Sequence, residues 1–223
     1  LKKCAVRELD RAKLLPLFQK YGFTSLLRRL PGGETLKQKN ESVLSGKKGP
    51  GRVRKANNTT SVDSSNFERF VEQMKAVEIF ACKEIISGAN VLEGQLVGLV
   101  FAANDSSYFV DLAKLASPQI QDVFKLFLRK DVLLVGHDLK QLVKALSLQG
   151  GGVVNRLFDA MIASYVLNSS TRAHDLYSIA LRELGIELPG SAKQSSLFGL
   201  DPAVAARELA VVRQAYEIYR KQL

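Results

Sequence analysis

The chain has 223 residues, 46% of them hydrophobic, which is enough for one substantial domain or two small ones and excludes a wholly disordered protein. Its formal net charge of +10 suggests a polyanionic partner, although a merely solvated basic surface would give the same value. No run approaches the roughly 18 apolar residues that span a bilayer, and we expect neither a membrane segment nor a leader peptide.

The two cysteines bear on the cellular compartment, and the first residue bears on whether the chain is part of a longer protein. Cys4 and Cys82 lie far apart and lack Cys-x-x-Cys spacing, so they indicate a reducing cytoplasm and argue against a disulfide framework or a zinc site. The sequence begins with Leu1 rather than Met. We therefore expect a fragment of a longer protein.

The N-terminal third divides into a helical part and a polar part. Between Asp10 and Leu30 apolar residues recur at helical spacing, and Gly22 separates two short helices. Residues 31–66 are rich in Lys, Asn, Ser, Thr and Gly and predict a disordered linker. The basic cluster between Lys47 and Lys55 is either an arm that tethers DNA or a solvated linker, and we favour the linker.

From Phe67 onward the pattern predicts a compact α/β domain. Apolar runs predict strands near residues 77–81, 95–102, 108–112 and 131–136, with a hairpin turn at residues 103–106. Helical periodicity predicts helices at residues 67–75, from Pro118, and at 139–148, 160–167, 175–184 and 202–221. Asp201 and Pro202 have the residue types of an N-cap and a first helical position.

Four sequence blocks resemble the 3′–5′ exonuclease domain of family A DNA polymerases. They are Leu96–Ala102, Val135–Lys140, Phe158–Ser169 and the segment that begins with His174-Asp175-Leu176. The resemblance implies an α/β, ribonuclease H-like fold of the DEDD exonuclease type, with a mixed sheet flanked by helices. Residues 10–30 resemble the last helices of the 5′-nuclease domain of bacterial DNA polymerase I. The implied organisation is 5′-nuclease helices at 1–30, a disordered basic linker at 31–66 and an exonuclease-like domain at 67–223.

The resemblance also shows which metal ligands this sequence lacks. The family binds two divalent metals through Asp-x-Glu on the first strand and an Asp in each of two later motifs, because such hard cations require several carboxylates. These positions are occupied here by Ala81, Lys83, Leu142 and Val212. Three of these side chains are apolar and one is cationic. We therefore expect no catalytic residue, metal site or cofactor in this fragment.

Other polar residues leave two alternatives open. An active 3′–5′ exonuclease would need a rearranged ligand set drawn from five carboxylates: Glu78, Glu84, Asp138, Asp159 and Glu208. A stand-alone nucleic-acid-binding module would instead bind nucleic acid tightly and with strong salt dependence. For Asp159 and Asp175 we favour helix capping, and for His137 and His174 we favour packing or capping over catalysis.

The resemblance implies a structural role within a larger enzyme. That enzyme would be a monomeric DNA-directed DNA polymerase of replication and repair, without proofreading, in the cytoplasm at the nucleoid. The implied partners are a polymerase domain beyond Leu223, which would use Mg²⁺, and DNA, bound weakly by basic surface. In the former metal site we expect Leu142 and Val212 to be buried against each other beside Ala81, and Lys83 to reach solvent or pair with a carboxylate such as Glu208.

Overall fold

The computed structural model describes Leu14, Leu17 and residues 59–88, 91–186, 188 and 201–223. The chain divides into two units, Leu1–Gly49 and Pro50–Leu223. In the first unit, Leu14 and Leu17 are helical. The remainder of the predicted 5′-nuclease helices, and the linker up to residue 58, lie outside the described residues.

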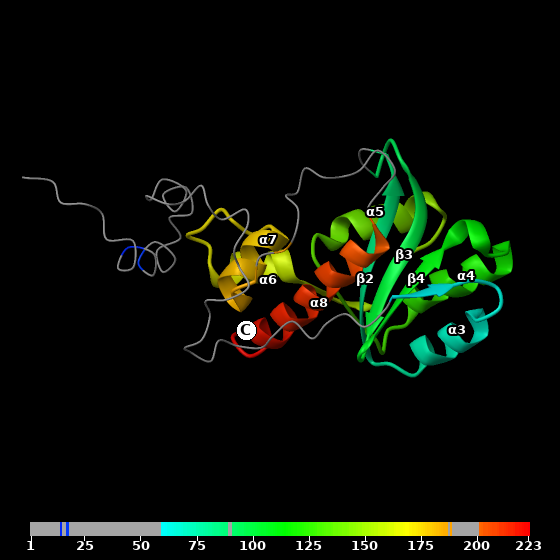
Figure 1. Cartoon of the computed structure of the whole chain (residues 1–223), viewed down its shortest axis with the longest axis horizontal. Coiled ribbons are helices and arrows are strands. Elements are labelled where there is room, and N and C mark those ends of the chain that lie inside the picture. The colour runs from blue at the N-terminus through cyan, green and yellow to red at the C-terminus, as the bar shows by residue number, and fades with distance from the viewer. Residues whose placement is uncertain (1–13, 15–16, 18–58, 89–90, 187, 189–200) are drawn as a thin grey trace, which may run out of the picture. The chain divides into compact units, whose positions relative to one another are not determined.

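The second unit is built on a six-stranded mixed sheet with the strand order β1-β4-β3-β2-β5-β6 (Figure 1). The strands are β1 (Thr60–Val62), β2 (Ile79–Ser87), β3 (Gln95–Ala103), β4 (Ser106–Asp111), β5 (Leu133–Gly136) and β6 (Arg156–Asp159). Strands β2, β3 and β4 form an antiparallel meander, whereas β5 runs parallel to β2, and β6 parallel to β5. The mixed sheet predicted from the sequence is thereby confirmed.

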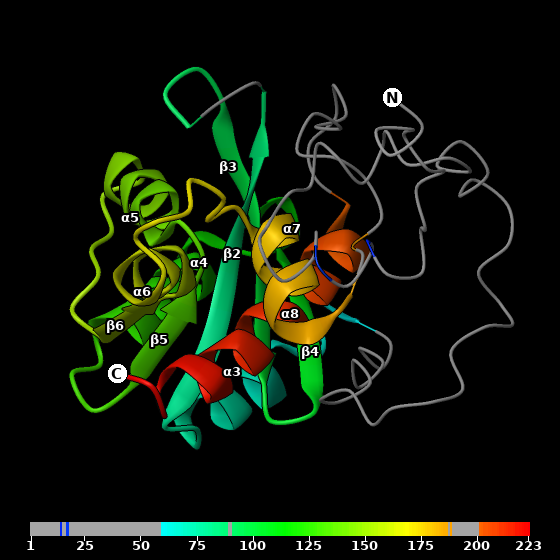
Figure 2. The same cartoon turned by 90° about the vertical axis from the view of Figure 1, so that its left-hand side faces the viewer.

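Helices cover both faces of this sheet (Figures 1 and 2). They are α3 (Phe67–Lys75), α4 (Ser117–Lys125), α5 (Leu139–Leu148), α6 (Ala160–Leu167), α7 (Leu176–Ile179) with the π-helix Ala180–Leu184, and α8 (Pro202–Tyr219). Short 3₁₀ turns lie at Leu112–Lys114 and Leu126–Leu128. None of the helices within the described ranges combines the length and the hydropathy needed to cross a bilayer.

Alternation along β2 separates two core clusters. Phe80 and Cys82 belong to a cluster that contains residues of α3, α4 and α5, which we call the α5-side core. Ala81 and Ile85 belong to a cluster that contains residues of α7 and α8, which we call the α8-side core. Because successive side chains of a strand point to opposite faces, the two clusters lie on opposite faces of the sheet.

Most predicted elements are confirmed, and three are corrected. The strand predicted at residues 77–81 is β2, which spans Ile79–Ser87. Strand β6 was not predicted. Thr60–Val62 falls within the predicted linker, but it forms β1 and pairs in parallel with β4. Three residues at a sheet edge show no periodicity, so their structure depends on the β4 partner. The folded domain consequently begins before Phe67.

Candidate functional site

Two of the four positions that carry metal ligands in the resembled family lie on the central strand β2. Ala81 is fully buried and paired with both neighbouring strands, with Ala102 on β3 and Val135 on β5. Lys83 lies two residues further along and so projects from the same face, toward α8. In the resembled family these two positions carry the Asp and the Glu of the first motif.

Lys83 forms an ion pair with Glu208 of α8. Its Nζ lies 2.5 Å from Glu208 Oε2, and the Lys83 side chain is 33% exposed whereas that of Glu208 is only 7% exposed. Tyr177 donates its hydroxyl to the other carboxylate oxygen at 3.4 Å. Burial, followed by the charge of Glu208, raises the pKa of Tyr177, which keeps it a donor. The predicted pairing of Lys83 with Glu208 is confirmed.

Leu142 and Val212 are both buried, each 1% exposed, but they do not meet. Val212 lies in the α8-side core together with Ala81, whereas Leu142 lies in the α5-side core together with Phe80 and Cys82. The prediction that they pack against each other was wrong. The reason is that α5 crosses the sheet on the opposite face from α8, so Leu142 is directed into the other half of the core.

Glu84 is the carboxylate with the most perturbed ionisation. It follows Lys83 on β2 and is partly buried. Burial raises the pKa of Glu84 from 4.5 to about 7, while nearby Lys83 lowers it and the charges of Asp138 and Glu208 raise it. A carboxyl group with such a pKa can exchange a proton near neutrality.

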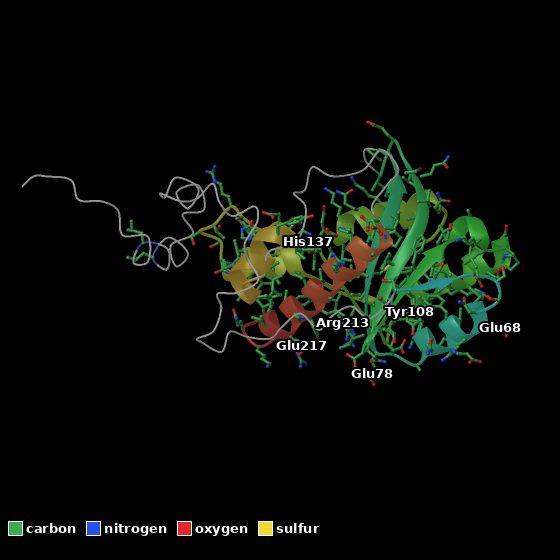
Figure 3. All side chains as sticks on the ribbon, in the orientation of Figure 1. Glu68, Glu78, Tyr108, His137, Arg213 and Glu217 are labelled. Carbon is green, nitrogen blue, oxygen red and sulfur yellow. The ribbon has the colours of Figure 1, made fainter. Side chains whose placement is uncertain are left out.

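Glu78 cannot join these groups, because it lies at the other end of the sheet. It is exposed and precedes β2, whereas His137 and Asp138 follow β5, which runs parallel to β2. Figure 3 shows Glu78 at the lower edge of the domain and His137 well above it. One carboxylate of the rearranged ligand set is thereby removed from the site.

Asp159 is fully engaged with backbone amides. Its Oδ1 accepts hydrogen bonds from the amides of Met161 (2.8 Å) and Asp138 (3.1 Å), and its Oδ2 accepts one from the amide of Leu139 (2.8 Å). It therefore caps α6, as predicted, and also holds the first turn of α5. Asp138 has a left-handed backbone, with φ at 53°, and its carboxylate accepts from Gln141 at 3.3 Å.

The residues around the two histidines also have structural partners. Asp175 caps α7 by accepting from the Ser178 amide (3.0 Å) and hydroxyl (2.7 Å), as predicted. The ring of His137 contacts the carbonyl of His174 at 2.9 Å, which ties the loop after β5 to the loop before α7. These contacts agree with the packing and capping roles expected from the sequence.

A buried polar network behind His174 was missed by sequence reasoning. His174 Nδ1 lies 2.9 Å from the hydroxyl of fully buried Ser164, which accepts from Arg182 at 2.6 Å. Arg182 also donates to Tyr219, whose hydroxyl donates to Glu183. A serine paired with a histidine can serve as a nucleophile, but Ser164 is inaccessible. Its position within an apolar helix gave no signal in the sequence.

The residues of this region do not fit a metal site. Within the residues that the structure describes, no three His, Cys, Asp or Glu side chains gather closely enough to hold a metal ion. The positions that carry ligands in the resembled family hold two apolar side chains in the α8-side core, one in the α5-side core and a paired ammonium.

Comparison with known proteins identifies the fold. The chain is similar to the EXO domain of Nibbler from Aedes aegypti (16% identity, TM-score 0.61, 74% of this chain and 88% of that one). It is also similar to the catalytic core of RRP6 from Trypanosoma brucei (17% identity, TM-score 0.63, 91% of this chain and 55% of that one). At these identities the two structures establish the fold, and the ribonuclease H-like class expected from the sequence is confirmed.

Two further matches concern DNA polymerase I. The structure is similar to Pol1 from M. smegmatis, whose POL domain was solved with a DNA primer-template and dNTP (15% identity, TM-score 0.58). The match covers 74% of this chain but only 27% of that polymerase. Residues 82–187 match the family model described as "DNA polymerase I, ribonuclease H-like domain". Residues 82–187 are thus similar to the ribonuclease H-like domain of DNA polymerase I.

Proposed function

We propose that this domain is a catalytically inactive 3′–5′ exonuclease-like domain that serves as a structural scaffold in a DNA polymerase I. The observation that carries the proposal is the ion pair between Lys83 and buried Glu208, located where the resembled family gathers metal-binding carboxylates. The whole protein would be a DNA-directed DNA polymerase, a nucleotidyltransferase of replication and repair, that lacks proofreading.

The electrostatics of the site oppose metal binding. Two divalent cations close together need several carboxylates to offset their charge, and catalysis through them requires an open coordination position. Here Lys83 already neutralises Glu208, and a metal ion would have to displace or repel its ammonium. Ala81 and Val212 are buried in the apolar α8-side core and offer no oxygen ligand.

The alternative, an active exonuclease with rearranged ligands, draws on the fact that one of the similar structures is the apo form of a nuclease. Of the five carboxylates available to it, Asp159 is bonded to three amides, Glu208 is paired and Glu78 lies at the far end of the sheet. Only Glu84 and Asp138 remain, and two carboxylates are too few for a two-metal site.

The remaining parts of the proposal concern partners and location. We place a polymerase domain after Leu223, with Mg²⁺ serving that domain alone. DNA would bind the present chain weakly through its basic residues, since the net charge of +10 favours phosphates. We further propose that the parent enzyme is a monomer of the cytoplasm, associated with the nucleoid.

A nuclease assay tests the central claim. The 1–223 chain is incubated with single-stranded DNA labelled at its 5′ end, in Mg²⁺ or Mn²⁺, beside a matched Glu84→Gln/Asp138→Asn variant. We expect no trimming by either protein. Trimming by the wild type that the variant lacks would establish the active alternative, whereas equal trimming by both identifies a contaminating nuclease and leaves the proposal standing.

A binding measurement tests the other alternative. A stand-alone nucleic-acid-binding module would bind single-stranded DNA tightly, with an affinity that falls steeply as salt concentration rises. The scaffold proposal predicts weak binding at every salt concentration. Fluorescence anisotropy of labelled DNA titrated with the 1–223 chain distinguishes the two.

A further inference from the structure

His174 is held at both of its ring nitrogens by uncharged groups. Its Nε2 lies 2.9 Å from the carbonyl oxygen of Thr171, and its Nδ1 lies 2.9 Å from the hydroxyl of Ser164. Because a carbonyl oxygen can only accept, Nε2 carries the ring hydrogen. Nδ1 is then the acceptor of the neutral ring, and Ser164 donates its hydroxyl to it. The observed contacts therefore fit one tautomer of the uncharged imidazole.

The hydroxyl oxygen that faces His174 already accepts a hydrogen bond from a cation. Arg182 Nη2 lies 2.6 Å from Ser164 Oγ, and Ser164 is fully buried. If the ring took up a proton, Nδ1 would become a donor and the Ser164 hydroxyl could no longer donate to it. An imidazolium and a guanidinium would then point at the same oxygen, where a low dielectric strengthens their repulsion. The network is therefore built for the neutral ring.

The charged groups around His174 offer an imidazolium no carboxylate of its own. Glu183 accepts from Arg182 Nε at 2.8 Å and from the Tyr219 hydroxyl at 3.1 Å, so it is already paired. Asp175 is engaged as the cap of α7 and interacts with the other histidine rather than with His174. Within the described ranges, the other titratable or charged groups beside the ring are Tyr165 of α6, in a T-shaped ring contact at 5.4 Å, exposed Arg172, and His137 after β5.

The contacts around His174 also clamp the segment that leads into α7, residues 168–175. Arg182 Nη1 donates to the carbonyl of Ala173 at 2.9 Å, and His137 Nε2 donates to the carbonyl of His174 at 2.9 Å. Arg182 itself lies in the π-helix that continues α7, so it ties the far end of the same unit back to its beginning. Histidine is the side chain whose charge changes most readily near neutrality, so His174 is the point at which pH acts on this unit.

We propose that His174 is a pH-sensitive switch: uptake of a proton by its ring releases residues 168–175 and the start of α7. Tyr177, the second residue of α7, then loses the hydroxyl contact with Glu208 at 3.4 Å. Because Glu208 is paired with Lys83, acidification loosens the packing of α7 on this ion pair. The switch is independent of catalysis, so it operates whether or not the domain cuts DNA.

Hydrogen–deuterium exchange followed by mass spectrometry tests the switch in the 1–223 chain. The exchange rates of amides in residues 168–178 are compared at about pH 7.5 and about pH 5.5, an interval in which histidine changes its charge. Each rate is first divided by the intrinsic exchange rate at that pH. We expect the corrected exchange to be at least about tenfold faster at the lower pH, and that of helix α3 to be unchanged.

Two variants assign the effect to one histidine of the two in the chain. His174→Gln keeps an acceptor for Ser164 and a donor for Thr171 but takes up no proton, so its corrected exchange should be equal at both pH values. His137→Gln is the matched control. Because Nε2 of His137 donates to a carbonyl, which an imidazolium can do equally well, the increase at low pH should persist in that variant.

Three results overturn the inference. Equal corrected exchange at both pH values in the wild type, which requires no variant to fold, shows that the network accommodates a charged ring. An increase that persists in His174→Gln, or that disappears in His137→Gln, assigns the effect to another titrating group. Nitrogen-15 chemical shifts of the two histidine rings give an independent measurement. They should show His174 with its hydrogen on Nε2 near neutral pH, and a hydrogen on Nδ1 would contradict the bonding scheme.

Discussion

Replacing Lys83 with Met tests how much the ion pair between Lys83 and Glu208 stabilises the packing of α8 on β2. Methionine keeps the length and the apolar stem of the lysine but removes its charge. Among the described residues, Glu208, whose side chain is 7% exposed, would then keep only the hydroxyl of Tyr177 at 3.4 Å. We expect the variant to be clearly less stable than the wild type, because a carboxylate is left buried without its counter-charge.

The unfolding free energy that Lys83→Met should lose depends on how deeply Lys83 and Glu208 are buried. Removing one partner of a fully buried pair costs about 3–5 kcal/mol, whereas an exposed pair contributes about 0–1 kcal/mol. Since the Lys83 side chain is 33% exposed and Glu208 is nearly inaccessible, we expect about 2–3 kcal/mol of unfolding free energy to be lost. For a domain of this size the loss corresponds to roughly 4–12 °C in melting temperature.

Urea unfolding of a double-mutant cycle measures the coupling free energy between Lys83 and Glu208. We expect Lys83→Met/Glu208→Gln to recover about 1 kcal/mol or more relative to Lys83→Met alone, because the second substitution removes the unpaired charge. The control is Lys125→Met, which breaks a pair with Asp122 whose side chains are 70% and 45% exposed. A Lys83→Met variant as stable as the Lys125→Met variant, or strictly additive effects in the cycle, would refute the reasoning.

Three further predictions follow from the core, from ionisation and from the domain boundary. Burial raises the pKa of Glu84 from 4.5 to about 7. Ionisation of Glu84 therefore lowers the unfolding free energy progressively as the pH rises from 4.5 to about 7, and the loss is complete above pH 7. Urea unfolding should therefore show Glu84→Gln to be more stable than the wild type above pH 7, by about 1–3 kcal/mol, with no difference below about pH 4.5. The losses of unfolding free energy caused by Leu142→Ala and Val212→Ala should add to within about 0.5 kcal/mol in the double variant, because the two side chains lie in separate clusters. Marked coupling between the two substitutions would contradict that separation. Limited trypsin digestion should cut after Lys55, within the segment predicted to be a linker, and the stable product should retain Thr60–Val62; loss of β1 from that product would contradict its pairing with β4.

The sequence by itself predicted the elements whose signals are local. Helices α3, α5 and α6 begin and end where apolar periodicity placed them, and Asp201 caps α8 by accepting from the amide of Ala203. The absence of carboxylates at positions 81, 83, 142 and 212 was also evident from the sequence, because ligand chemistry depends on residue type alone. Lys83 could be expected to seek a carboxylate, since an unpaired buried charge is too costly.

Only the tertiary structure decided which distant residues meet. Whether Leu142 joins Val212 depends on the face of the sheet that α5 crosses, and the spacing within a helix contains no information on that face. Strand β1 exists because β4 offers it a free edge, since three residues have no period of their own. Asp159 caps α6 through its own local sequence, but its bonds to the first turn of α5 arise because β5 and β6 end side by side. Local propensity acts over one or two turns, whereas these contacts join segments about twenty or more residues apart, so they are fixed by the packing of the whole domain.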